Sequence, residues 1–201
     1  MKKIQRTAAG LDTFFKIAYR LGIVAIVFSS IVILFMWYLY MGAPELISKL
    51  RLSLNFGMIQ FQVSPDVVPT REHGFLFLAL GTIISVAQLP VFCMIFSSIR
   101  GILAPIKDGT PFHDDIVYYL KRLGWLTVAN GIIGNLANLV VYGNLLPGYN
   151  LGELFLSDKI TAVTASYSFD LTFVLYAFIL FLLSYIFQYG RELQQLSDET
   201  L

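Results

Sequence analysis

The amino-acid sequence predicts an all-α membrane protein, a bundle of four transmembrane helices that carries a small extracytoplasmic β-hairpin. Three observations predict this fold class. The chain is 57% hydrophobic and 13% charged, whereas an ordinary soluble domain is about 45 to 50% apolar. Four apolar stretches each have about the 20 residues that an α-helix needs to cross a hydrocarbon core. The loop after the first stretch alternates apolar and polar residues on both sides of a glycine, which is typical of paired strands.

The predicted spans contain no Asp, Glu, Lys, Arg or His, and they cover residues 21–40, 75–98, 123–142 and 171–189. A basic segment precedes the first span, as it would in a signal peptide. That stretch is nevertheless longer than the roughly 7 to 15 apolar residues of a signal peptide, and no small-residue cleavage site follows it. We therefore expect the first stretch to be retained, and residues 21–189 to form the membrane domain.

The distribution of basic residues predicts the orientation. Four spans place both termini on one side, and ten of the 14 Lys and Arg residues lie on that side. Because cytoplasmic loops carry the excess of Lys and Arg, both termini are expected in the cytoplasm. The parts outside the spans are then a cytoplasmic N-terminal segment (1–20), two outer loops (41–74 and 143–170), one inner loop (99–122) and a cytoplasmic tail (190–201).

The N-terminal segment 1–20 has apolar residues at helical spacing among basic ones. This pattern predicts an amphipathic helix that lies on the inner leaflet of the lipid bilayer. An ordinary topology signal explains the basic residues equally well. The apolar residues are Ile4, Leu11, Phe15 and Ala18.

Outer loop 41–74 carries apolar side chains at every second position on both sides of Gly57. A period of two is that of a strand face, so the loop is predicted to form the β-hairpin. An isolated hairpin must bury one face to persist, which favours a structural cap over the helix ends, with a binding site as the alternative. The alternating residues are Leu50, Leu52, Leu54, Phe56, Ile59, Phe61 and Val63.

The third span is rich in small and polar residues that share one helical face. Small residues let helices approach closely, and buried amides can bond across helices, so this face is predicted to be the packing seam of the bundle. A solute path lined by the same residues is the alternative. Gln88 of the second span is predicted to contact Asn135, and Asp170 is predicted to cap the fourth helix. The intramembrane packing residues are Gln88, Gly131, Asn135 and Asn138, and the face also includes Gly124, Thr127 and Gly134.

The sequence offers little for catalysis or nucleic-acid binding. A formal net charge of +1 gives no clustered basic excess for phosphates. Cys93 cannot form an internal disulfide, and His73 and His113 are assigned to opposite sides of the membrane. No hydrolase, zinc or phosphate-binding motif is present. We therefore expect no enzyme activity, no cofactor, no metal site and no direct contact with nucleic acid.

The inner loop contains the polar stretch "PIKDGTPFHDD", residues 105–115. Pro105 is expected to stop the second helix, and the following Gly and Thr to form a turn. Asp114 and Asp115 fit the first turn of the next helix, where acidic side chains complement the helix dipole. Phe112 is expected to pack against that turn.

This loop and the tail together resemble a bacterial family of four-span membrane proteins, domain-of-unknown-function family 2975. The resemblance rests on a Gly-x-Pro-Phe turn before the third span and on a tail of the form Gly-x-x-Leu-Gln followed by Asp-x-Thr. His113 departs from the family pattern, which has Thr or Ser at the helix cap, so Thr110 or Asp114 is expected to cap instead. The matching residues are Gly109, Pro111 and Phe112 in the turn, and Gly190, Leu193, Gln194, Asp198 and Thr200 in the tail.

The resemblance implies a location in the bacterial cytoplasmic (inner) membrane. It also implies a cytoplasmic partner, because many members are encoded beside a small helix-turn-helix regulator. We therefore expect a membrane protein of regulatory or accessory type whose turn and tail residues bind such a regulator or another cytoplasmic protein. Within the chain, the tail leucines Leu193 and Leu196 are expected to dock against Phe112. The alternative is a small transporter or channel subunit that forms a homo-oligomer through Asn135 and Asn138.

Overall fold

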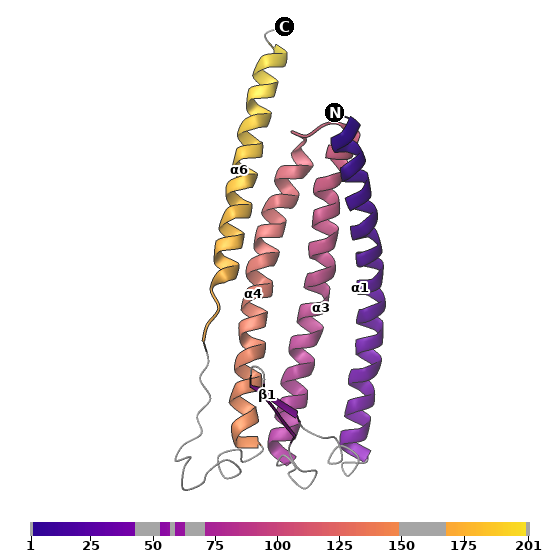
Figure 1. Cartoon of the computed structure of the whole chain (residues 1–201), viewed down its shortest axis with the longest axis vertical. Coiled ribbons are helices and arrows are strands. Elements are labelled where there is room, and N and C mark those ends of the chain that lie inside the picture. Colours follow the sequence, from indigo (N-terminus) through magenta and orange to yellow (C-terminus); the bar gives the residue numbers. More distant parts are fainter. Residues whose placement is uncertain (1, 43–52, 57–58, 63–70, 149–167, 200–201) are drawn as a thin grey trace. The chain divides into compact units, whose positions relative to one another are not determined.

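The computed structural model describes residues 2–42, 53–56, 59–62, 71–148 and 168–199. Four helices contain most of these residues (Figure 1): α1 (Lys2–Gly42), α3 (Arg71–Asp108), α4 (Asp114–Gly148) and α6 (Thr172–Glu199). Each of the four is long and apolar enough to cross a membrane. Their large apolar side chains are widely exposed, as expected of helices that face lipid. The predicted membrane fold built on four apolar helices is confirmed at this level.

The chain divides into two compact units. The first unit comprises Met1–Val27, Ala87–Asn135 and Phe169–Leu201, and the second comprises Phe28–Val86 and Leu136–Ser168. Helices α1, α3 and α4 contribute to both units, whereas α6 belongs to the first alone. The first unit holds residues of both α4 and α6, including most of the face of the third span that is predicted to be a packing seam.

In the second unit, the described contacts join α1 to α3 and α3 to α4. The Trp37 indole nitrogen donates to the Thr82 hydroxyl at 3.2 Å, and the Trp37 and Phe75 rings meet edge to face with centroids 5.5 Å apart. A Cβ atom at Gly148 would lie 3.3 Å from the His73 Cβ atom. Aromatic residues thus pack at the ends of apolar helices, where amphipathic rings are favoured.

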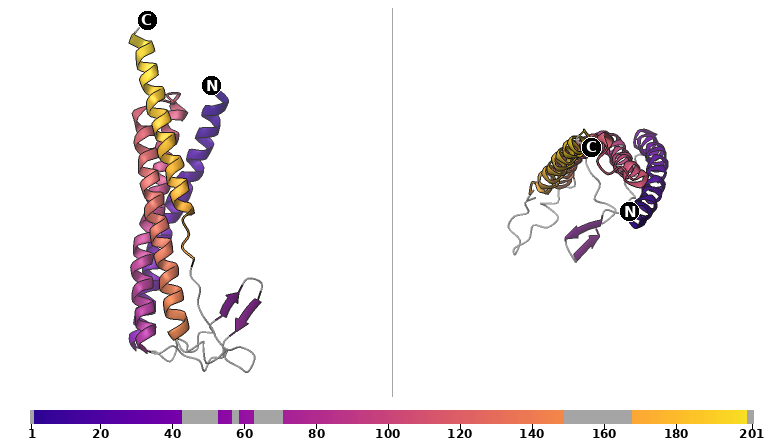
Figure 2. Two further views of the ribbon diagram at one scale, coloured as in Figure 1. Left: turned by 90° about the vertical axis from the view of Figure 1, so that its left-hand side faces the viewer. Right: turned by 90° about the horizontal axis from the view of Figure 1, so that it is seen from above.

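Two short strands, β1 (Ser53–Phe56) and β2 (Ile59–Gln62), pair antiparallel (Figure 2). Leu54 lies opposite Phe61 and Phe56 lies opposite Ile59 in the register. The pair falls within the loop whose alternation predicts a hairpin around Gly57. The side of the membrane on which it lies and its role as a cap stay predictions.

Helix α3 does not stop at Pro105, so that expectation is wrong: α3 passes through Pro90 and Pro105 and ends at Asp108. A proline removes one backbone donor and can be accommodated in an apolar helix whose neighbours satisfy the freed groups. Gly109, with a φ of 87°, ends the helix instead. The Thr110 amide donates to the Pro105 carbonyl at 2.9 Å and the Gly109 amide donates to the Ile106 carbonyl at 3.2 Å, which is the Schellman motif.

The N-terminal segment continues directly into the first span as one helix, α1. In the first unit its Asp12 carboxylate accepts a hydrogen bond from the Arg100 guanidinium of α3 at 2.9 Å and lies 3.9 Å from the Lys107 ammonium. The Phe15 and Phe96 rings lie 6.2 Å apart. One face of the segment therefore packs on α3, which the helical spacing of its apolar residues did not predict.

Candidate functional site

The turn between α3 and α4 comprises residues 109–113, and its two ends are capped by different side chains. The Thr110 hydroxyl donates to the Pro105 carbonyl at 3.2 Å and so closes the end of α3. The His113 ring nitrogen Nδ1 accepts a hydrogen bond from the Asp115 amide at 3.2 Å. His113 is therefore the cap of α4, and the expectation that Thr110 or Asp114 caps this helix is wrong. Thr110 is already engaged with α3, which leaves His113 next to the free amides of α4.

The Nδ1 atom of His113 also lies 3.3 Å from the Asp115 carboxylate. The two contacts require different states of the ring. Only an unprotonated Nδ1 accepts from the Asp115 amide, and only a protonated Nδ1 donates to the carboxylate. With Nδ1 unprotonated the ring caps the helix, whereas a proton on Nδ1 would direct the ring to the exposed Asp115 carboxylate instead.

Phe112 packs on α6, next to Gly190. A Cβ atom at Gly190 would lie 2.6 Å from Cε1 of Phe112, so the missing side chain makes room for the ring. The Phe112 and Phe187 ring centroids lie 5.9 Å apart. The turn and the tail, which carry the two motifs of the resemblance, are thus brought together at Phe112 and Gly190. The two tail leucines that were expected to dock against Phe112 remain exposed, Leu193 at 49% and Leu196 at 59%.

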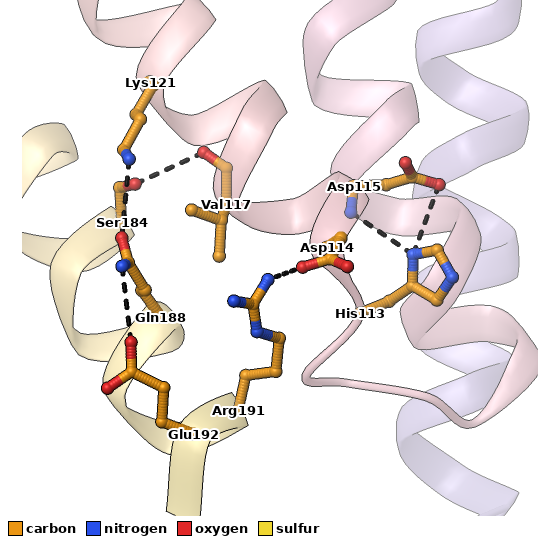
Figure 3. A network of polar contacts seen from close by, with 9 residues as sticks. All are labelled: His113, Asp114, Asp115, Val117, Lys121, Ser184, Gln188, Arg191 and Glu192. Atoms are coloured by element: carbon orange, nitrogen blue, oxygen red, sulfur yellow. Dashed lines mark hydrogen bonds and ion pairs between the residues drawn. The ribbon is translucent and has the colours of Figure 1, made fainter. Parts of the chain in front are cut away.

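Beyond this contact, polar side chains link α4 to α6 over two helical turns (Figure 3). Arg191 forms an ion pair with Asp114. One turn further, the Lys121 ammonium donates to the Gln188 carbonyl oxygen and the Gln188 amide donates to Glu192, both at 3.4 Å. The Ser184 hydroxyl, which is fully buried, donates to the Val117 carbonyl at 3.2 Å. The polar end of the two helices is therefore held by side chains from both.

Further along, the α4–α6 contact becomes a seam of small residues against aromatic rings. Phe181 lies over Gly124, where a Cβ atom would come within 2.6 Å of its ring, and Phe173 lies over Gly131 even more closely. The small residues of the predicted seam thus let α6 approach the α4 backbone. A Cβ atom at Gly134 would meet nothing within 4 Å, so this residue of the predicted face takes no part in the contact.

Asn135 ends the seam by binding the backbone of Asp170. Its amide nitrogen donates to the Asp170 carbonyl at 2.9 Å, and its carbonyl oxygen accepts from the Asp170 amide at 3.0 Å. The same nitrogen also lies 2.9 Å from the Gly131 carbonyl, and Asn135 is only 4% exposed. The Asp170 carboxylate accepts a hydrogen bond from the Thr172 amide at 2.8 Å, as expected of a residue that caps a helix.

This register places the start of α6 part of the way along the apolar stretch of α4. The apolar stretch of α4 begins at Leu123, next to Gly124 and Phe181, and Asn135 follows about 18 Å further along the helix. A hydrocarbon core is about 30 Å thick. Asp170 therefore lies more than halfway into the apolar stretch of α4. Relative to that stretch, α6 is shifted along its axis in the direction of its own C-terminus.

The remaining predicted residues are distributed as follows. Gln194 is exposed on α6, Asp198 lies near the end of α6, and Thr200 lies outside the described residues. Gln88 is half-buried on α3 and Asn138 is exposed on α4. Asn135 bonds to the Gly131 carbonyl of α4 and to the backbone of Asp170, and its predicted contact with Gln88 stays a prediction.

Sequence reasoning missed two ion pairs, Asp12 with Arg100 and Asp114 with Arg191. A signal existed for both. Asp12 is the lone acid in a basic segment, and Arg191 is the lone basic residue after the fourth span. A residue of such isolated charge is a candidate for an ion pair with another helix.

A scan against protein-family models and searches of curated proteins and of solved structures found no match. The function is therefore inferred from the packing of the first unit.

Proposed function

We propose that this chain is a regulatory or accessory membrane protein that binds a cytoplasmic protein through a turn–tail surface. This surface comprises the 109–113 turn and residues 190–199 of α6. The proposal includes four membrane crossings in the bacterial cytoplasmic membrane, cytoplasmic termini and an extracytoplasmic hairpin. The observation that carries it is the packing of Phe112 on Gly190, which makes one surface from two segments far apart in the sequence.

The exposed apolar face of α6 supports this proposal. Ile186, Tyr189, Leu193 and Leu196 are all more than 45% exposed and share one helical stripe. Because α6 is displaced, this stripe extends beyond the level of Lys121, where the apolar stretch of α4 has ended. An apolar stripe outside the hydrocarbon core is typical of a protein-binding site.

The charge of the surface indicates the kind of partner. Exposed carboxylates surround the apolar stripe and the turn: Asp108, Asp115, Glu192 and Glu199. Such a surface complements a partner with a basic face. A helix-turn-helix regulator, which needs basic residues to neutralise DNA phosphates, has this property.

The binding test compares capture by the full chain and by two variants of equal charge change. Leu196→Asp places a carboxylate in the α6 stripe, and Ile4→Asp does the same on the exposed face of α1. The wild-type chain and Ile4→Asp should recover the same specific soluble protein, and Leu196→Asp should lose it. Recovery should fall as salt is raised, because the charges are exposed. Equal recovery with Leu196→Asp, with Phe112→Asp and with a chain ending at Gly190 contradicts the proposal.

The orientation is tested separately with single cysteines. Cys93 is the one native cysteine, so Cys93→Ala gives a background for Asn55→Cys in β1 or Gln195→Cys in α6. A thiol reagent that cannot cross membranes should label Asn55→Cys in intact cells and Gln195→Cys only after permeabilisation. The opposite result overturns the orientation whatever the outcome of the capture test.

A second candidate function is a small transporter or channel subunit, and the position of Asp170 favours it. An ionisable residue deep in an apolar region is a common marker of a solute or ion path. In liposomes, the purified chain should then move a solute, and Asn135→Leu should change the rate by releasing Asp170. Exposed Asn138 offers a polar contact for a homo-oligomer, whereas Asn135 is engaged by Asp170. A flux equal to that of empty liposomes contradicts this function.

A further inference from the structure

A groove of about 370 Å³ lies between α4 and α6 and is lined mainly by aromatic side chains. Lys121 and Trp125 come from α4, and Phe181, Tyr185 and Gln188 come from α6. The Trp125 and Phe181 rings meet edge to face with centroids 5.5 Å apart. Because Phe181 lies against Gly124, its ring is held close to the α4 backbone.

The groove has a polar end and an apolar end. At the polar end the Lys121 ammonium donates to the neutral amide of Gln188 at 3.4 Å (Figure 3). The Glu192 carboxylate accepts a hydrogen bond from the Gln188 amide nitrogen. Gln188 therefore lies between this carboxylate and Lys121. Among the described ion pairs, none neutralises Lys121.

The position of the groove along α4 matches the boundary between lipid headgroups and acyl chains. Lys121 precedes the apolar stretch that begins at Leu123, and Trp125 lies about one turn after Lys121, just inside that stretch. Trp125 and Tyr185 are 67% and 68% exposed, so the groove opens to the surroundings of the helices. Tryptophan and tyrosine favour this boundary, and a lysine there reaches lipid phosphates.

We propose that this groove is a binding site for an anionic glycerophospholipid. The Lys121 ammonium binds the phosphate, and one acyl chain lies along Trp125 and Phe181. A zwitterionic lipid supplies the same acyl contact but carries its own cation, so it gains less from Lys121. The site requires membrane insertion of α4 and α6, and it does not depend on binding of a cytoplasmic partner.

The test uses the full chain with Trp37→Phe, which leaves Trp125 as the sole tryptophan of the two in the sequence. The protein is reconstituted in phosphatidylcholine vesicles with a small fraction of brominated phosphatidylglycerol or of brominated phosphatidylcholine with the same acyl chains. Bromine quenches tryptophan fluorescence on contact. Quenching should indicate about fivefold enrichment of the anionic lipid at Trp125, the order expected for one lysine at an anionic surface.

Three variants in the same background separate the site from general charge attraction. Lys121→Gln should make the two brominated lipids quench equally, and Lys121→Arg should keep the preference because it keeps the charge. Lys16→Gln removes an exposed lysine of α1 that does not line the groove, and it should keep the preference. Equal quenching in the parent chain overturns the proposal, as does an unchanged preference in Lys121→Gln or an equal loss in Lys16→Gln. Unchanged Trp125 emission without brominated lipid verifies that each variant is folded.

Discussion

At one end of the α4–α6 contact, Arg191 and Asp114 pair across the helices, whereas at the other end the Asn135 amide binds the backbone of Asp170. The first pair is accessible, with side chains 29% and 69% exposed. Asn135 is 4% exposed. An exposed ion pair contributes about 0 to 1 kcal/mol, but a buried group left without its partner costs about 1 to 3 kcal/mol.

The difference indicates that the Asn135 end fixes α6 more firmly than the exposed ion pair does at the turn end. At the turn end, Phe112 meets Gly190 through the far edge of its ring, and that edge can swing aside. At the seam, Phe173 meets Gly131 through the base of its side chain, which cannot move without moving α6. A surface that adjusts while the helices stay packed suits the binding of a partner.

The largest expected effect is that of Asn135→Leu. This substitution leaves the amide and the carbonyl of Asp170 without their partner, at about 1 to 3 kcal/mol for each group. Asn138→Leu is the matched control, because Asn138 is exposed on the same helix. Unfolding in mixed detergents, followed by circular dichroism, should show a large decrease in the free energy of unfolding for Asn135→Leu and little change for Asn138→Leu. Equal stability of the two variants would mean that Asn135 does not hold α6.

A smaller loss of stability is expected for Gly131→Ala, because the new Cβ atom would overlap with the Phe173 side chain. Overpacking of this kind typically costs about 1 to 3 kcal/mol. The matched control is Gly134→Ala, since nothing lies within 4 Å of a Cβ atom there. The control should be neutral or slightly stabilising, because alanine favours a helix more than glycine does. The same unfolding measurement distinguishes them, and a stable Gly131→Ala chain would contradict the close approach of α6.

The same glycine-to-alanine change at the turn end tests the comparison directly. Gly190→Ala also meets an aromatic ring, but only its flexible edge, Cε1 of Phe112 at 2.6 Å. We expect a loss below about 1 kcal/mol, since the ring can turn away. Gly190→Ala should nevertheless reduce capture of the cytoplasmic partner, because it displaces Phe112. A loss of stability as large as that of Gly131→Ala would show that both ends are equally rigid.

The sequence predicted the apolar helices well because the length and composition of a membrane helix are local properties. It also identified Gly124, Gly131 and Asn135 as packing residues, since a face of small and polar residues is visible in the order of residues alone. It did not identify α6 as their partner. Which helix lies against a face, and at what register, depends on contacts such as Gly131 with Phe173, which are distant in the sequence.

At the turn, too, the sequence predicted the local feature but not the detail that tertiary contacts set. Proline and glycine predicted that the chain reverses near residues 105–109, but local rules placed the helix end at Pro105, which was wrong. The end is set by Gly109 together with two hydrogen bonds to the carbonyls of Pro105 and Ile106. The pairing of Asp12 with Arg100 likewise required knowledge of which helices are neighbours. Tertiary contacts therefore decided the details that composition and periodicity left open.

The smallest expected effect is that of His113→Ser at the cap of α4. Serine is among the preferred residues at this position, so its hydroxyl should bond a free amide better than the imidazole does, for a gain of about 0.5 kcal/mol. His113→Ala removes the cap altogether and should lower stability by a similar amount. Both changes lie at the adjustable end, so neither should approach the loss from Asn135→Leu. Unfolding in the same mixed detergents measures them, and a His113→Ser chain no more stable than His113→Ala would show that the Asp115 amide gains nothing from position 113.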